Sequence, residues 1–119
     1  MTILIVDDEK EIVELLKNRF IVKGHSVNTA YDGKKALELI KSNIYDLIFL
    51  DHNMPGLTGL ELLRYIKQNN LKPKTVIVTG YEEIDEFFMK GRGADEYLTK
   101  PVKIRDIDDI VDKYSKLTK

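Results

Sequence analysis

The sequence predicts an α/β fold in which helices cover both faces of a doubly wound, five-stranded parallel sheet. Five short apolar or β-branched runs alternate with five longer segments whose apolar residues recur at helical spacing. The connections between these segments are short. Such an alternation favours parallel strands joined by crossover helices. Several of the short runs also stop at a polar residue, at the strand end where open α/β sheets place their ligand sites.

The composition is that of a globular domain with a well-solvated surface. Lys and Arg number 19, Asp and Glu number 20, and 43% of the residues are hydrophobic. The length predicts one domain over residues 1–119. The net charge of -1, without any basic run, argues against a nucleic-acid partner. The absence of cysteine excludes disulfides and thiolate chemistry. Because we find neither a signal peptide nor an apolar stretch of about 18 residues, we expect a cytoplasmic protein without a membrane partner.

The first half of the chain is predicted to contain three strands and two helices. Residues 2–6 are typical of a buried strand. Asp8 and Glu11 have the spacing of a capping box, and Gly24 ends the helix that they begin. The elements that follow are a strand at 26–30, a helix around 36–40 and a strand at 46–50, with a turn at Pro55-Gly56 beyond it.

The second half continues the alternation. A helix begins after Gly59, a β-branched strand covers 75–78, and a fourth helix runs from 82 to about 90. Tyr97 lies in a short fifth strand, which ends before Pro101 because proline cannot continue a central strand. The closing helix begins near residue 104. Its early turns carry acidic residues and its end carries lysines, which complements the helix dipole.

Polar residues stand at the carboxyl ends of four of the five strands. Asp7 and Asp8 follow the first strand, Asp51 the third, Thr79 the fourth, and Lys100 the fifth. If the strands are ordered 2-1-3-4-5, the first and third are neighbours at the switch point, and the three acids meet there. Crowded carboxylates either take up protons or recruit a hard cation, for which Mg²⁺ is the natural choice. An ammonium and a hydroxyl beside them are groups that hold phosphoryl oxygens.

Each of these residues also has a simpler interpretation. The two neighbouring acids could cap a helix, Asp51 could begin a loop, Thr79 could be one more β-branched strand residue, and Tyr97 a half-buried sheet residue. Lys100 could be a solvated charge before a proline. The coincidence of all of them at the strand ends favours the functional interpretation. Neither histidine has a second soft ligand at metal spacing, so we assign no metal and no catalysis to their side chains.

Five motifs occur in order along the whole chain. They are VDDE at 6–9, D-x-x-M-P-G at 51–56 followed by Gly59, Thr79-Gly80, G-A-D at 93–95 and Lys100-Pro101. Together they resemble the receiver domain of two-component response regulators. Any one of these motifs is common, but the ordered set is specific. The resemblance implies the flavodoxin-like receiver fold with strand order 2-1-3-4-5.

The resemblance also implies a phosphoacceptor and a metal site. Asp51 would be the phosphoacceptor and would attack a phosphohistidine on a sensor histidine kinase or a histidine phosphotransfer protein. Asp8 and Asp51 would bind Mg²⁺ directly, together with the backbone carbonyl of Asn53. Asp7 would act largely through water.

Further residues are assigned to the phosphoryl group and to the switch. Lys100 and Thr79 would contact phosphoryl oxygens, and backbone N–H groups at His52 and Gly80 would complete the cradle. Tyr97 would turn inward when the threonine moves toward the phosphate.

Three more expectations concern the neighbourhood of the site. The Lys100-Pro101 peptide bond would be cis. Val102 departs from the common family pattern, in which a phenylalanine is frequent, and should leave the loop before the last helix less well packed. Tyr81 lies beside the threonine and would slow hydrolysis of the acyl phosphate by shielding it from water.

The implied function is that of a stand-alone response regulator or a phosphorelay carrier. It would not be a turnover enzyme, although it would catalyse its own phosphorylation and, slowly, its dephosphorylation. Output would pass through the face formed by helix 4, strand 5 and helix 5, in a monomer or a weak phosphorylation-dependent dimer. An aspartate-nucleophile phosphatase is disfavoured because Asn53 stands where its general acid would be. A flavin carrier lacks its phosphate loop, and a scaffold that takes no phosphate would not need the complete site.

Overall fold

The computed structural model describes residues 1–54, 56–80 and 86–117, and five parallel strands within them form one sheet. The sheet has the order β2-β1-β3-β4-β5, which confirms the predicted fold class and strand order. The strands are β1 (Thr2–Val6), β2 (Ser26–Ala30), β3 (Leu47–Asp51), β4 (Lys74–Thr79) and β5 (Glu96–Thr99). The helices are α1 (Lys10–Val22), α2 (Gly33–Ser42), α3 (Gly59–Gln68), α4 (Glu86–Gly91) and α5 (Ile104–Leu117).

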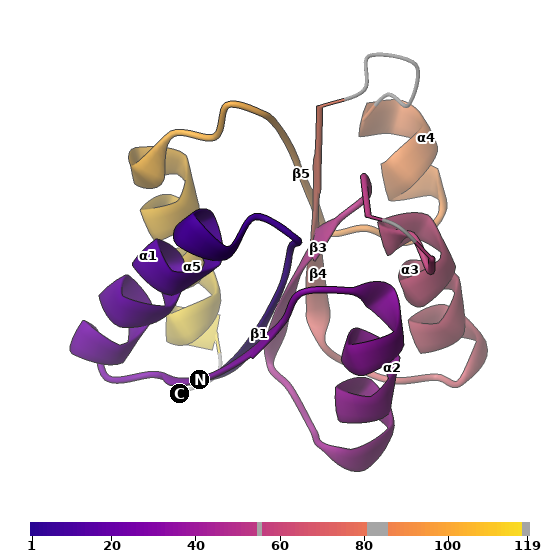
Figure 1. Cartoon of the computed structure of the whole chain (residues 1–119), viewed down its shortest axis with the longest axis horizontal. Helices are drawn as coiled ribbons and strands as arrows, with labels where there is room; N and C mark the ends of the chain where they lie inside the picture. The colour runs from indigo at the N-terminus through magenta and orange to yellow at the C-terminus, as the bar shows by residue number, and fades with distance from the viewer. Residues whose placement is uncertain (55, 81–85, 118–119) are drawn as a thin grey trace.

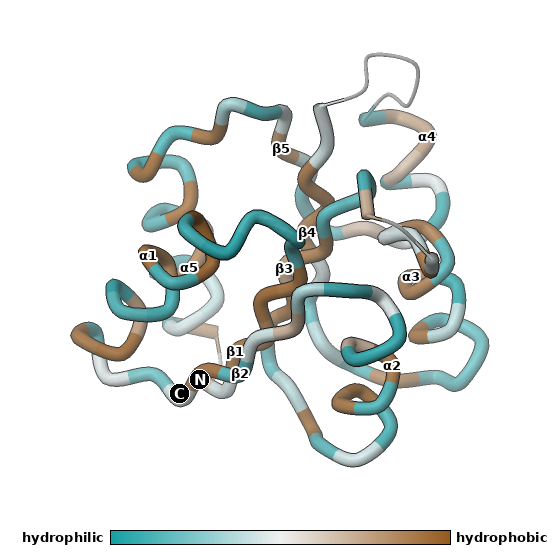
Figure 2. The backbone as a smooth tube through the Cα atoms, viewed as in Figure 1, coloured by the Kyte–Doolittle hydropathy of each residue, from teal (hydrophilic) through white to brown (hydrophobic). Residues whose placement is uncertain are grey.

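The helices lie in two layers, one on each face of the sheet. Figure 1 shows α1 and α5 on one face and α2, α3 and α4 on the other. Each face has its own apolar core. On the α1 and α5 side, Phe20 stacks on Phe49 with ring centroids 5.7 Å apart. On the other side, Leu50 and Ile77 pack with Leu63 of α3. Figure 2 shows the apolar colouring concentrated along the central strands.

The central strands are buried on both faces, as their continuous apolar runs predict. Residues 3–6 of β1 and 47–50 of β3 are each at most 3% exposed. Successive side chains point to opposite faces, so each strand contributes to both cores. Asp51 is the last residue of β3, one position beyond the predicted end of that strand.

The helix caps differ from the sequence prediction. The capping box predicted at Asp8 does not form, because α1 begins one residue later and Glu9 holds the N-cap without a side-chain cap hydrogen bond. The carboxylate of Asp7 instead accepts the N–H of Glu9 at 2.9 Å. A capping box that we did not predict begins α3, where Thr58 and Glu61 accept each other's backbone N–H groups at 3.2 Å.

Two predictions fall partly outside the described residues. The fourth helix was expected from residue 82, and α4 is described from Glu86 onward. Pro55, the first residue of the predicted Pro55-Gly56 turn, also lies outside the described residues. Among the helices that the structure describes, none is long and apolar enough to cross a membrane.

Candidate phosphoacceptor site

The three predicted acids meet at the carboxyl edge of the sheet. Val6 of β1 pairs in register with Leu50 of β3, so the residues that follow them lie side by side. One carboxylate oxygen each of Asp7, Asp8 and Asp51 lies within 4.8 Å of the others. Asp51 is 1% exposed and Asp7 is 7% exposed, whereas Asp8 faces solvent. Two nearly buried carboxylates and one exposed carboxylate therefore share one small volume.

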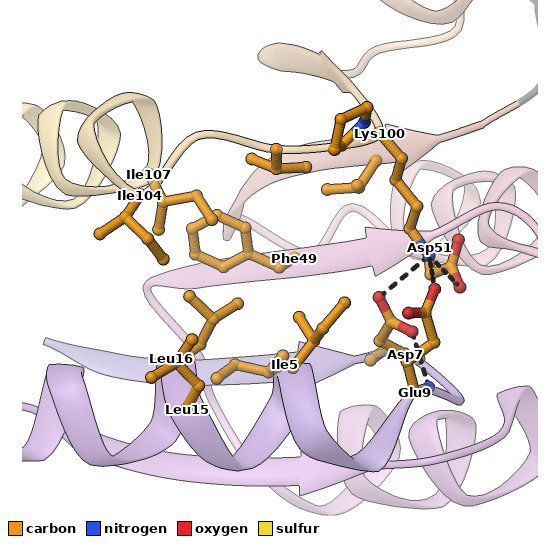
Figure 3. A pocket seen from close by; sticks show the side chains of 15 residues that line it. Ile5, Asp7, Glu9, Leu15, Leu16, Phe49, Asp51, Lys100, Ile104 and Ile107 are labelled. Atoms are coloured by element: carbon orange, nitrogen blue, oxygen red, sulfur yellow. Dashed lines mark hydrogen bonds and ion pairs between the residues drawn. The ribbon is translucent and has the colours of Figure 1, made fainter.

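Lys100 reaches into this cluster from the end of β5. Its Nζ lies 2.8 Å from a carboxylate oxygen of Glu9 and 3.4 Å from oxygens of Asp7 and Asp51 (Figure 3). Burial by itself would lower the pKa of Lys100, but the hydrogen bond to Glu9 and the neighbouring carboxylates raise that pKa above its usual value. The ammonium is therefore fully protonated at neutral pH.

One ammonium does not balance the acids. Burial, with a further contribution from the charge of Asp51, raises the pKa of Asp7 to about 6. This occurs although the Glu9 N–H and the Lys100 ammonium both favour its ionised form. The site is therefore short of positive charge. Its donors are carboxylate oxygens, the ligands that a hard divalent cation such as Mg²⁺ prefers, so the residues fit the predicted metal.

The backbone after Asp51 corrects one predicted contact. The N–H of His52 donates to the carbonyl of Val78 at 2.9 Å and is thus used within the sheet. The N–H of Asn53 donates to Oδ1 of Asp51 at 3.0 Å. The N–H that donates to the Asp51 carboxylate therefore belongs to Asn53. Because the His52 N–H is already paired with Val78, we withdraw its assignment to the phosphoryl group. The sequence motif locates this turn but does not reveal which of its two N–H groups the sheet uses.

Thr79 and Gly80 lie beside the side chain of Asn53. Thr79 ends β4, is fully buried, and donates from Oγ1 to Oδ1 of Asn53 at 3.4 Å. A Cβ added at Gly80 would lie 3.4 Å from the Asn53 side-chain nitrogen, which places the Gly80 backbone at the same site. Tyr97 is half-buried near the start of β5, where it pairs in register with Ile77 of β4. Its side chain packs against the core on the face of the sheet that α2, α3 and α4 cover.

The fifth strand leads directly into the site. The N–H of Lys100 donates to the carbonyl of Thr79 at 2.9 Å, which continues the β4–β5 pairing by one residue. The peptide bond between Lys100 and Pro101 is cis. Tyr81, to which we assigned a shielding role, lies outside the described residues.

The comparisons with known proteins agree with this geometry. Residues 3–112 match the family model described as the response regulator receiver domain. The chain belongs to this family. The receiver is 37% identical over 105 residues to response regulator ArlR of Staphylococcus saprophyticus, a match covering 88% of this chain and 48% of that protein. It therefore spans about half the length of the curated relatives that it matches.

Solved receiver structures resemble it closely. The receiver domain of a Francisella response regulator has a TM-score of 0.89 at 36% identity and covers 99% of this chain and 98% of its own. Response regulator TrrA from Thermotoga maritima, solved in complex with Mg²⁺ and BeF, has a TM-score of 0.83 at 35% identity. That match covers 95% of this receiver and 97% of TrrA.

Two residues of this receiver acquire a role that we did not predict from the sequence. Glu9 makes the shortest contact to Lys100, although we noted it only as the last letter of a motif. No signal in the sequence pairs two residues 91 positions apart. Gly59 lets the first turn of α3 approach Asp51 closely, because a Cβ there would lie 2.9 Å from the carbonyl oxygen of Asp51.

Proposed function

We propose that this receiver domain accepts a phosphoryl group on Asp51 from the phosphohistidine of a sensor histidine kinase or a histidine phosphotransfer protein, in a Mg²⁺-dependent reaction. The observation that carries the proposal is the placement of the Asp51 carboxylate. It ends a buried strand, is crowded by Asp7 and Asp8, and faces the Lys100 ammonium. Receiver domains as a family are phosphorylated by histidine kinases, so the donor follows from family membership.

In the proposed step, a carboxylate oxygen of Asp51 attacks the phosphorus atom of the donor. An O–P bond forms, the P–N bond breaks, and its electron pair stays on the departing imidazole. The Asn53 N–H holds Oδ1, while Oδ2 lies 3.4 Å from Lys100 Nζ, so we assign the attack to Oδ2. The lysine then lies where it neutralises the negative charge of the transferred oxygens.

The metal ligands are assigned to the same cluster. Asp8, Asp51 and the backbone carbonyl of Asn53 would hold Mg²⁺, with Asp7 acting largely through water. When bound, the ion would neutralise charge on the phosphoryl oxygens and orient the group for in-line transfer. The receiver TrrA, which was solved with Mg²⁺ and BeF, supports the proposal of a Mg²⁺ site in this receiver.

The response to phosphorylation begins at Thr79 in this proposal. Its hydroxyl donates to Asn53 in the unphosphorylated protein and would donate to a phosphoryl oxygen instead, with the Gly80 N–H as a second donor. Tyr97, on the neighbouring strand, would then turn further inward and alter the surface formed by α4, β5 and α5. Through that surface the domain would contact a downstream protein, as a response regulator or a phosphorelay carrier.

The test is incubation with acetyl phosphate and Mg²⁺, followed by intact mass measurement. We expect one phosphoryl adduct that requires Mg²⁺ and is absent in Asp51→Asn. The matched control is Asp46→Asn, which makes the same change at the opposite edge of the sheet and should leave the adduct intact. An adduct on Asp51→Asn would contradict the proposal. So would failure of the wild type with both acetyl phosphate and a panel of phosphorylated histidine kinases.

A further inference from the structure

A cavity of about 550 Å³ opens directly beside the phosphoacceptor site. It lies between α1 and the connection from β5 to α5, over the face of the sheet that these helices cover (Figure 3). Ile5, Phe49 and Val78 of the sheet and Leu16 and Ile107 of the helices line its inner part. Its volume and apolar lining are those of a small-molecule site.

The polar groups of the cavity gather at one end. Figure 3 shows Asp7, Glu9 and Asp51 with the tip of Lys100 at that end, while the labelled apolar side chains extend away from it. These three carboxylates and one ammonium leave an excess of two negative charges when all are ionised. Lys100 already contacts all three acids. Because this one ammonium is shared among the three acids, the polar end of the cavity presents excess negative charge to a ligand.

The outer wall of the cavity leaves apolar surface in water. Ile12 and Leu15 of α1 line it and are 39% and 56% exposed. Val102, in the connection from β5 to α5, also lines the cavity and packs against the core on this face of the sheet. A ligand with an apolar body would remove this surface from water, which is favourable in proportion to the area buried.

We propose that this cavity binds a small organic cation, with an aromatic or branched aliphatic body among the apolar side chains and an ammonium group against Asp7, Glu9 and Asp51. Charge complementarity selects the sign of the head group, and the size of the cavity selects a body of drug-like dimensions. Such a ligand would use the same carboxylates as a metal ion and would regulate the site by occupying it. The proposal does not depend on phosphorylation of Asp51.

The test uses 4-phenylbutylamine as the probe on the full chain without Mg²⁺, with ¹H–¹⁵N NMR titration as the readout. We expect saturable binding with shifts at Ile5, Leu16 and Val102. We also expect affinity at least about tenfold higher than for 4-phenylbutyrate, which has the same body and the opposite charge. Equal binding of the two probes, shifts confined to another surface, or absence of saturable binding would overturn the proposal.

Variants separate the body from the head group. Val102→Phe fills the cavity and should weaken binding of the amine by roughly tenfold, whereas Val22→Phe, at an 86% exposed position, should leave it unchanged. Leu15→Lys places a like charge on the exposed wall, should also weaken binding, and is a surface change that does not threaten folding. Glu9→Gln should weaken the amine by about threefold and leave 4-phenylbutyrate no weaker. Unchanged amine affinity in Val102→Phe and Leu15→Lys would place the probe elsewhere and refute the proposal.

Discussion

Aspartate side chains have opposite effects at the amino edge of the sheet, where the strands begin, and at the carboxyl edge, where they end. At the amino edge, before β3, Asp46 accepts the N–H of Thr2 at 2.8 Å. Before β5, Asp95 accepts the N–H of Thr75 at 2.8 Å and its hydroxyl at 3.3 Å. Each of these carboxylates ties the start of one strand to its neighbour. Both are therefore expected to stabilise the fold.

At the carboxyl edge the carboxylates face one another. Asp7 and Asp51 are more deeply buried than Asp46 and Asp95, and one lysine serves both of them and Glu9. The raised pKa of Asp7 shows that its ionised form is disfavoured there. Aspartates at both edges accept backbone N–H groups, so the difference lies in their neighbours. An aspartate stabilises this sheet where no second buried carboxylate lies beside it, and destabilises the sheet where buried carboxylates crowd around one ammonium.

The largest expected effect is that of removing the lysine from the carboxyl edge. Lys100→Met should slow phosphorylation by acetyl phosphate about 10²- to 10³-fold, because the charge facing the acceptor oxygen is lost. The rate is measured by intact mass against time at saturating Mg²⁺. Lys74→Met is the matched control, since Lys74 lies 4.0 Å from Asp95 at the amino edge. Equal slowing in both variants would remove the distinction between the edges.

The next effect concerns stability at the amino edge. Asp95→Ala should lower the free energy of unfolding by about 2 kcal/mol, because the buried Thr75 loses the acceptor of its N–H and the nearer of the two acceptors of its hydroxyl. Urea unfolding measures the change. Asp8→Ala, which removes an exposed acid at the opposite edge, should cost less than about 0.5 kcal/mol. If Asp8→Ala proves the more damaging of the two, the comparison fails.

Asp7→Asn should change the free energy of unfolding in the opposite direction. Without Mg²⁺ at pH 7 it should raise the free energy of unfolding by about 1 to 2 kcal/mol, because the amide removes a disfavoured charge and can still accept the Glu9 N–H.

The pH dependence of that difference follows from the pKa of Asp7. This pKa rises from 3.8 to about 6 on folding, so protonated Asp7 stabilises the fold below pH 3.8, and the contribution is lost as the pH rises through 6. The stability of the wild type relative to Asp7→Asn should fall between pH 4 and pH 6.5 and then level off. Urea unfolding at several pH values measures it, and a constant difference would contradict this electrostatic explanation.

The smallest effect is expected at Asp46. Asp46→Ala should cost about 1 kcal/mol, since one backbone N–H at the start of β1 loses its partner near solvent. Asp46→Asn keeps an acceptor oxygen and should cost less. Thermal unfolding of the two variants measures the difference, and identical losses would show that the hydrogen bond is not the source of the stabilisation.

Much of this could be predicted from the sequence because it depends on local patterns. The continuous apolar runs of β1 and β3 predict strands buried on both faces, and their acidic ends predict the cluster of Asp7, Asp8 and Asp51. The predicted cap of α1 was wrong because the helix begins at Lys10, one residue later than predicted, and spacing alone does not fix the first residue of a helix.

Other features depend on distant residues. The pairing of Glu9 with Lys100 exists only once β1 and β5 are placed in one sheet. The N–H of His52 was misassigned because it pairs with Val78 of the neighbouring strand, a partner that the local sequence does not contain. Contacts of this kind follow from the assembled sheet and not from any single segment.

The most direct test of the central comparison is the Mg²⁺ dependence of thermal stability in three proteins. A cation that binds only the folded state stabilises it by an amount that grows with the logarithm of its affinity for the site. We predict that Mg²⁺ raises the Tm of the wild type and of Asp95→Asn by similar amounts. Asp7→Asn should begin at a higher Tm and gain much less. An equal rise in Tm in Asp7→Asn, or no rise in the wild type, would contradict the conclusion that the crowded carboxylates of the carboxyl edge form a cation site.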